Sequence, residues 1–313
     1  MTQQMCNLGR VVVLMGGMSS EREVSLMSGT GVMKALQSVG VDAVAFDPAE
    51  EPIESLRGRF DRAFIALHGR FGEDGAVQGV LEFLQIPYTG PGIRASAIAM
   101  DKAVTRSLWQ SAGLPVAQGM VARCVADAQC ILDTLGPDVV VKPSCDGSSI
   151  GVTKLADASC EDIAAALEEA LKFDDEVLVE QRIFGREFTV AILDGKALPI
   201  IEIRAPEGDY DYQNKYFGDA VKYDCPAQLS NEATEKVAQA CEKAFAVLQA
   251  RGWGRIDVMM REDGSFVLLE LNTSPGMTPH SLVPMAARAT GMSYADLVVH
   301  VLAHASLDHK ISH

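Results

Sequence analysis

Asp257, Glu270 and Asn272 carry oxygen-bearing side chains whose spacing could hold a metal ion. They belong to two apolar, strand-like runs separated by Asp263-Gly264, which is a strong signal for a two-residue hairpin turn. With that turn, or with any loop of even length centred there, Asp257 faces Glu270, and Asn272 projects from the same face opposite Arg255. Hard oxygen ligands suit Mg²⁺, which usually bridges to substrate phosphates, so the hairpin predicts a magnesium site.

The alternative interpretation of this hairpin is an exposed polar face that Arg255 balances. Two neighbouring carboxylates repel each other unless a positive charge lies between them. The surrounding positions are strongly apolar, which indicates a buried hairpin and favours the metal site. These positions are Ile256, Val258, Met259, Met260, Val267, Leu268, Leu269 and Leu271.

The stretch KPSCDGSSIG at residues 142–151 has the parts of a phosphate-binding loop, although the sequence contains no Walker A or dinucleotide-binding motif. Small residues leave backbone N–H groups open to an anion, and Lys142 adds a positive charge. The stretch joins two expected strands rather than a strand and a helix. An ordinary hairpin loop is therefore an equally good interpretation of this stretch taken alone.

The first hundred or so residues alternate strand-like and helical patterns, which predicts a small parallel α/β domain. Residues 11–14 form a β-branched run before Gly16-Gly17, and Ser20 with Glu23 fits a capping box at the start of a helix. Further strand-like runs are expected at residues 41–47, 61–67 and 84–89.

The rest of the chain predicts a second set of strands and helices. Asp101 can cap a helix that ends at Gly113. Residues 205–226 are polar and rich in Tyr and Asp, and a loop of this length is expected to be a functional lid. Strands are expected at residues 138–142, 150–154, 177–180 and 187–193, and helices at residues 160–172 and 231–251.

Composition limits the class of partner. The 313 residues suffice for about two domains. The 27 basic and 42 acidic residues give a net charge of −15, which argues against binding to nucleic acid or to an anionic membrane. The seven cysteines form no CxxC pair, and the apolar run at residues 11–15 is too short for a signal peptide or a membrane span. We therefore expect a cytoplasmic protein with reduced thiols.

Nine motifs in a characteristic order resemble those of the D-alanine–D-alanine ligases, a family of the ATP-grasp superfamily. The motifs extend over residues 16–284, nearly the whole chain, and their combination is far more specific than any one of them. They are GGMSSEREVS (16–25), HGRFGEDG (68–75), YTGPG (88–92), MDK (100–102), VKPSCDGSSIG (141–151), EFTV (187–190), YDYQNKY (210–216), WGRIDVM (253–259) and LELNTSPGMTPHSLVP (269–284).

The resemblance implies an ATP-grasp fold preceded by a small parallel α/β domain, with domains expected at residues 1–98, 99–183 and 184–313. It implies that ATP phosphorylates the carboxylate of one D-alanine and that the amine of a second D-alanine then displaces phosphate. The product would serve peptidoglycan synthesis. The implied cofactors are ATP and Mg²⁺, with two metal ions expected and Mn²⁺ as a substitute, and the implied assembly is a homodimer.

Roles at the ATP site also follow from the resemblance, position by position. Asp257, Glu270 and Asn272 would hold magnesium. Gln181 stands where relatives often carry Lys beside the adenine, so this contact departs from the family pattern. The implied ATP contacts are Lys102, Lys142 and Lys215 at the phosphates, Ser149 in the Gly/Ser stretch, Glu180 and Ile183 at the adenine, and Glu187 at the ribose.

Two D-alanine molecules share the remaining implied contacts. Glu21 would hold the ammonium group of the first molecule, with His68 nearby. Arg255 and the Gly276 amide would stabilise the tetrahedral oxyanion, where preorganised donors are most effective. The carboxylate of the second molecule would lie at Ser281 and Leu282. Ser148 and Tyr216, hydrogen-bonded with Glu21, would position the phosphate-binding loop over the long loop.

Simpler interpretations stay open for several of these residues. Glu21 fits a first-turn acid favoured by the helix dipole, and Lys102 fits a solvated residue of a first turn. Tyr216 fits loop packing. His68 fits a hydrogen-bonded histidine at a strand end, and without the motifs this interpretation leads. The order of the motifs favours the functional roles, more for Glu21 and Tyr216 than for His68.

Two other functions fit the same fold. One is a D-alanine–D-lactate (depsipeptide) ligase, but relatives of that kind lack the YDYQNKY loop, so Tyr216 favours the dipeptide. The other is a non-catalytic, nucleotide-binding regulator. A regulator would be indicated by an eroded metal or oxyanion position, and every such position is present here.

Overall fold

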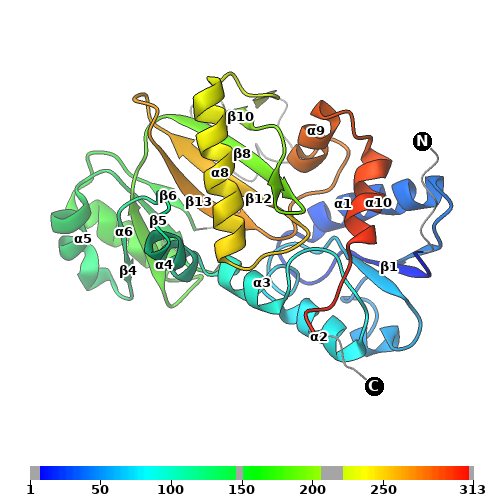
Figure 1. Ribbon diagram of the computed structural model, residues 1–313. Coiled ribbons are helices and arrows are strands. Elements are labelled where there is room, and N and C mark those ends of the chain that lie inside the picture. Colours follow the sequence, from blue (N-terminus) through cyan, green and yellow to red (C-terminus); the bar gives the residue numbers. More distant parts are fainter. Residues whose placement is uncertain (1–7, 146–150, 206–220, 310–313) are drawn as a thin grey trace.

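A computed structural model describes residues 8–145, 151–205 and 221–309, and three β-sheets lie within these ranges (Figure 1). The N-terminal sheet is parallel, and the other two are antiparallel. This arrangement confirms the predicted α/β class, in which a small parallel domain precedes the larger part of the chain.

The N-terminal sheet has the strand order β2-β1-β3, with Val11 opposite both Ala43 and Arg62. The predicted strand at residues 84–89 is wrong, because within that run only Tyr88 makes a β-bridge. The elements are β1 (Val11–Leu14), α1 (Arg22–Ser38), β2 (Ala43–Phe46), η1 (Ile53–Leu56), β3 (Arg62–Ile65), α2 (Ala76–Leu84) and α3 (Ile93–Met100).

The predicted capping box at the start of α1 is also wrong. The N-cap of α1 is Glu21, and no side chain caps the helix there. Ser20 lies in the preceding turn, where the neighbouring Ser19 hydroxyl donates to the carbonyl of His68 at 2.8 Å. The segment that follows β3 therefore holds this turn in place. Glu21, at the helix start, is only 7% exposed.

The second sheet has the order β4-β7-β5-β6 and confirms strands on both sides of the Gly/Ser stretch, of which residues 146–150 lie outside the described ranges. Asp101 caps α4 as predicted, accepting a hydrogen bond from Val104 N at 3.0 Å. The elements are α4 (Lys102–Ser111), β4 (Gly119–Ala122), η2 (Val125–Asp127), α5 (Ala128–Leu135), β5 (Val139–Pro143), β6 (Thr153–Lys154), α6 (Cys160–Ala170) and β7 (Val177–Gln181).

The third sheet has the order β11-β10-β8-β12-β13, with β9 beside β8, and α8 crosses one face of it (Figure 1). Most of the expected lid at residues 205–226 lies outside the described ranges, but its end forms strand β11 instead of loop. The elements are β8 (Arg186–Leu193), β9 (Lys196–Ala197), β10 (Ile201–Arg204), β11 (Lys222–Asp224), α8 (Asn231–Val247), β12 (Trp253–Met260), β13 (Phe266–Asn272), α9 (Leu282–Ala289) and α10 (Tyr294–Ala303).

One hydrophobic core joins the N-terminal sheet to the last helices of the chain. Val13 of β1 and Leu36 of α1 belong to the same buried cluster as Val298 of α10 and Trp253 of β12. Figure 1 shows α10 alongside α1. The core therefore brings the turn before α1 close to the segment that follows β13, and the expected domain limits stay predictions.

Candidate active site

The β12–β13 hairpin pairs Asp257 with Glu270, and Arg255 with Asn272, as predicted. The predicted two-residue turn is wrong, because Arg261 N donates to the Ser265 carbonyl and leaves three residues in the loop. A register shift just after Asp257 adds one unpaired residue on β13 and compensates for the odd loop. The pairing that brings the two acids together therefore depends on a bulge as well as on the turn.

Asp257 lies at the centre of a buried hydrogen-bond network and is 6% exposed. Arg255 donates to both of its carboxylate oxygens, from Nε at 2.9 Å and from Nη2 at 2.7 Å. The Thr189 hydroxyl donates to Oδ1 at 2.6 Å, and Asn272 Nδ2 donates to Oδ2 at 3.2 Å. The alternative interpretation of the hairpin as an exposed polar face is therefore wrong, although Arg255 does balance the negative charge of Asp257.

Two lysines extend this charged group toward the second sheet. Lys102 Nζ lies 3.5 Å from Glu270 Oε2, and Lys142 Nζ lies 2.6 Å from Glu180 Oε2. Arg106 also contacts Glu180, at 3.4 Å. Cations that are paired with acids in this way can exchange those acids for the phosphates of a nucleotide.

The other residues expected at the ATP site lie close to β7 and β8. Ile183 is in the link between these strands, and Glu187 is on β8, opposite Met259. Gln181 donates to the Leu135 carbonyl at 3.2 Å. Four expected site residues lie outside the described ranges, namely Ser148, Ser149, Lys215 and Tyr216.

Ser28 and His68 hold the segment after β13 at two points. His68 Nδ1 lies 2.7 Å from the Ser274 carbonyl, which can only accept, so Nδ1 is the donor. Ser28 Oγ accepts from Met277 N at 3.1 Å and lies 3.1 Å from His68 Nε2. Burial lowers the pKa of His68 and favours the neutral ring, so Nε2 accepts from Ser28. Both ring nitrogens are thus satisfied, and Gly276 lies between the two anchored residues.

Glu73 is a residue of this region that the motif analysis did not single out. Its Oε2 accepts from Gly69 N at 2.8 Å, and its Oε1 accepts from Ser274 N at 2.9 Å. Burial and the nearby Glu21 carboxylate raise the pKa of Glu73 to about 8. The available signal was an acid in the HGRFGEDG motif just before α2, at a position where an ordinary helix-start acid is also expected.

Glu73→Gln is expected to flatten the dependence of folding stability on pH. Because the folded-state pKa is raised from 4.5 to about 8, the folded protein binds more protons than the unfolded chain in this interval. The contribution of Glu73 is therefore complete below pH 4.5 and is lost as the pH rises through about 8. Urea denaturation between about pH 5 and pH 8 should show a slope difference of at most ~1.4 kcal/mol per pH unit. Parallel slopes for the two proteins would contradict this assignment.

Glu21 completes this side of the site. Gly69 has a φ of +64°, a backbone conformation that favours glycine, and a Cβ atom there would lie 2.6 Å from Glu21 Oε2. Glu21 also contributes to the electrostatics of both His68 and Glu73. The structure therefore brings Glu21 and His68 together, as the resemblance implies.

The last two expected substrate positions lie at the start of α9. Ser281 is the N-cap residue, and its hydroxyl accepts from Thr278 N at 3.0 Å and bonds to the Thr278 hydroxyl at 2.8 Å. Leu282 is the first residue of the helix. Backbone N–H groups at a helix N-terminus attract anions such as a carboxylate.

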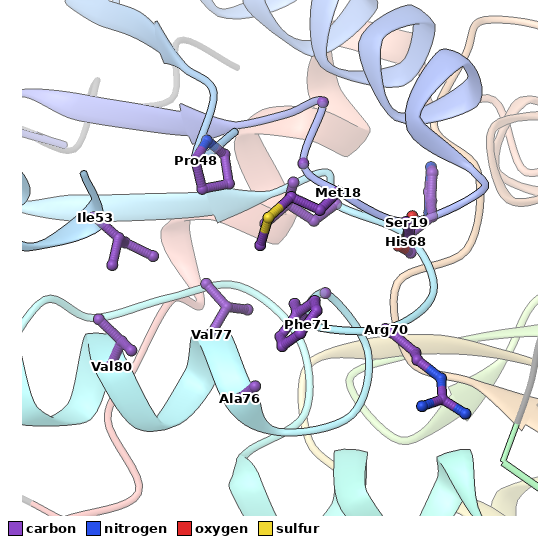
Figure 2. Close-up of a pocket in the computed structure, with 14 residues that line it drawn as sticks. Met18, Ser19, Pro48, Ile53, His68, Arg70, Phe71, Ala76, Val77 and Val80 are labelled. Carbon is purple, nitrogen blue, oxygen red and sulfur yellow. Dashed lines mark hydrogen bonds between the residues drawn. The ribbon is translucent and has the colours of Figure 1, made fainter. Parts of the chain in front are cut away.

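An apolar cavity of about 200 Å³ adjoins His68 and the turn before α1 (Figure 2). Its walls come from the Gly16–Ser19 turn, from the segment after β3 and from α2, and Figure 2 shows His68 and Ser19 at one end. Its apolar lining includes Ile53, Val77 and Phe71. A lining of this kind is poorly suited to an ionised amino acid.

Two further observations concern the cysteines and the length of the helices. All six cysteines within the described ranges are free thiols. In the same ranges, no helix is long and apolar enough to cross a membrane.

The fold thus combines a parallel α/β domain with two antiparallel sheets, and Glu270 of the buried acid hairpin lies beside Lys102. Residues 45–91 match the family model described as "D-ala D-ala ligase N-terminus", and residues 108–303 match "D-ala D-ala ligase C-terminus". The chain therefore belongs to the D-alanine–D-alanine ligase family.

Individual relatives support this membership. The chain is 54% identical to the D-alanine–D-alanine ligase of Delftia acidovorans, over 96% of this chain and 94% of the relative. It is 51% identical to that of Ralstonia nicotianae, over 98% and 94%. The crystal structure of D-alanine–D-alanine ligase from Bacillus anthracis has a TM-score of 0.83 and 35% identity, over 94% of this chain and 96% of that one. A structure of the Bacillus anthracis ligase complexed with ATP has the same TM-score at 33% identity.

Proposed function

We propose that this chain uses ATP to join two D-alanine molecules into D-alanyl-D-alanine for peptidoglycan synthesis. The observation that carries the proposal is the buried pairing of Asp257 with Glu270, next to Lys102 and within a chain of this family. The first D-alanine carboxylate attacks the γ-phosphorus of ATP, and ADP leaves. The amine of the second D-alanine then attacks the acyl phosphate carbon, and phosphate leaves.

Positive charge and fixed donors explain how this chain promotes both steps. Lys102 and Lys142 are assigned to the phosphates, where transfer depends mainly on positioning and charge neutralisation. Arg255 and the Gly276 amide are assigned to the oxyanion that forms during amine attack. The contacts of Ser28 and His68 on both sides of Gly276 support this assignment, since they hold its amide in one place.

The acid hairpin fits magnesium. Asp257, Glu270 and Asn272 offer only oxygen ligands for a metal, from adjacent paired strands, and no sulfur or imidazole lies among them. We assign Mg²⁺ to these residues, with a second ion in the same group, where bound metal would neutralise charge on the transferring phosphate. Glu180, Ile183 and Glu187 are assigned to the nucleoside part of ATP.

The two amino-acid sites are assigned to opposite sides of Gly276. Glu21 is assigned to the ammonium of the first D-alanine, and the start of α9 at Ser281 and Leu282 to the carboxylate of the second. The roles of Ser148, Ser149, Lys215 and Tyr216 rest on the family motifs alone. We also propose a homodimer that works in the cytoplasm, where free thiols persist.

The test is to supply ATP, Mg²⁺, D-alanine and an excess of D-lactate at neutral pH and to identify the products by mass spectrometry. We expect phosphate release to require D-alanine and the product to be almost entirely D-alanyl-D-alanine. Mostly D-alanyl-D-lactate would favour the depsipeptide ligase. ATP binding without any release of phosphate would favour the regulator.

A further inference from the structure

Asp194, His300 and His304 form a compact group on the side of the molecule where α10 ends. One ligand atom from each side chain lies within 4.8 Å of the other two. Within the described ranges, no other group of three or more His, Cys, Asp or Glu residues has this geometry. His300 Nε2 lies 2.5 Å from Asp194 Oδ2, and His304 Nε2 lies 3.8 Å from the same oxygen.

The fold presents these side chains on well-defined elements. His300 and His304 are four residues apart, one turn apart on the same face of the end of α10, where His304 is the C-cap. Asp194-Gly195 is the two-residue turn between β8 and β9, with φ values of 51° and 76°. Asp194 N also donates to the Gly252 carbonyl at 2.7 Å. The geometry is therefore set by a helix end and a tight hairpin.

A cation at this group would replace the hydrogen bond between His300 Nε2 and Asp194 Oδ2. His304 Nδ1 lies 2.8 Å from the His300 carbonyl and must donate to it, so in the neutral ring Nε2 carries the lone pair. Asp194 Oδ2 lies 3.8 Å from that nitrogen, and both atoms can be metal ligands. A metal ion between them would bind both atoms. A backbone carbonyl that orients a ligating imidazole is a common feature of metal sites.

We propose that Asp194, His300 and His304 bind one Zn²⁺ ion. Two imidazole nitrogens and one carboxylate suit zinc rather than magnesium, and a water molecule would complete four-coordinate geometry. The ion would fasten the end of α10 to the β8–β9 turn. Asp194 lies five residues along the chain from Thr189, about 17 Å in an extended strand, so the ion takes no part in the proposed ligation.

The test is calorimetric titration of Zn²⁺ into the full chain with excess Mg²⁺ present, to saturate the magnesium site proposed at the acid hairpin. We expect one Zn²⁺ per chain and a rise in the midpoint of thermal unfolding on binding. Asp194→Asn keeps a residue that tolerates the turn and removes the charge. His304→Asn keeps a donor near the Nδ1 position and removes Nε2. Each change should weaken binding by at least about 10- to 100-fold and leave D-alanine-dependent turnover unchanged.

Two controls separate this site from other zinc ligands. His309→Asn changes an exposed histidine outside the group and should keep native affinity. Co²⁺ in place of Zn²⁺ should give the spectrum of nitrogen and oxygen ligands, without the intense thiolate charge-transfer bands that cysteine ligands would produce. No zinc binding, unchanged affinity in both Asp194→Asn and His304→Asn, or a thiolate spectrum would overturn the proposal.

Discussion

Glu270→Gln is expected to lower D-alanine-dependent turnover by about 10²- to 10³-fold while the fold survives. The change keeps the shape of the side chain and removes one of the two negative charges that face each other at the Asp257–Glu270 pair. Folding should be little affected, because Glu270 is partly exposed and its ion pair with Lys102 is long, at 3.5 Å. Turnover measured across a magnesium titration would show both the loss of rate and a shift of the half-maximal rate to higher magnesium concentration.

Glu262→Gln is the matched control for this experiment. It makes the same chemical change in the exposed loop of the same hairpin, and it should leave turnover and magnesium dependence unchanged. Native turnover by Glu270→Gln at limiting magnesium would remove Glu270 from the metal site. Equal losses in both variants would indicate a general effect of charge on the hairpin.

The pairing of the acid hairpin could be predicted because its signals are local. Alternating apolar residues and one Asp-Gly dipeptide were enough to place Asp257 opposite Glu270. The same signals could not distinguish a two-residue turn from a three-residue loop followed by a bulge, since Gly264 fits either one. The predicted pairing is correct because the extra loop residue and the bulge after Asp257 shift the register in opposite directions and cancel.

The contacts around Gly276 could not be predicted from any local pattern. Ser28 and Met277 are 249 positions apart, and His68 and Ser274 are 206 positions apart. Such pairs depend on how α1, β3 and the segment after β13 share one core. Family motifs included His68, Ser274 and Met277 without saying which atoms meet, and Ser28 lies outside every motif.

The misplaced elements have a similar cause. The run at residues 84–89 has the composition of a strand, but α2 extends to Leu84 and the chain then makes only a bridge at Tyr88. Ser20 and Glu23 have the correct spacing for a capping box, yet the turn before α1 is bonded to His68. In the first case the helix includes the start of the run, and in the second a tertiary contact prevails over a favourable local signal.

Arg255→Met is expected to lower the free energy of unfolding by about 3–5 kcal/mol, in addition to abolishing most turnover. Arg255 supplies two of the hydrogen bonds to Asp257, which is 6% exposed, so the change leaves a buried carboxylate without its cation. Combining it with Asp257→Asn should restore much of the lost stability, because the orphaned charge is then removed. Turnover should not recover in the double variant, since both residues are assigned to the reaction. Urea denaturation measures stability, and phosphate release measures turnover.

Arg261→Met, at the other end of the same hairpin, is the control for loss of an arginine. Arg261 contacts Ser265 at 3.3 Å near the loop, away from any buried acid, so its loss should cost less than about 1 kcal/mol. Equal destabilisation by Arg255→Met and Arg261→Met would show that the ion pair between Arg255 and Asp257 adds nothing to the free energy of unfolding beyond the loss of any arginine. A double variant no more stable than Arg255→Met would show that the lost packing of the guanidinium, and not the unpaired carboxylate, accounts for the effect. The expected result, with stability restored and turnover still absent, separates the two uses of one ion pair: it neutralises a buried charge in the fold, and it holds Arg255 where the oxyanion is proposed to form.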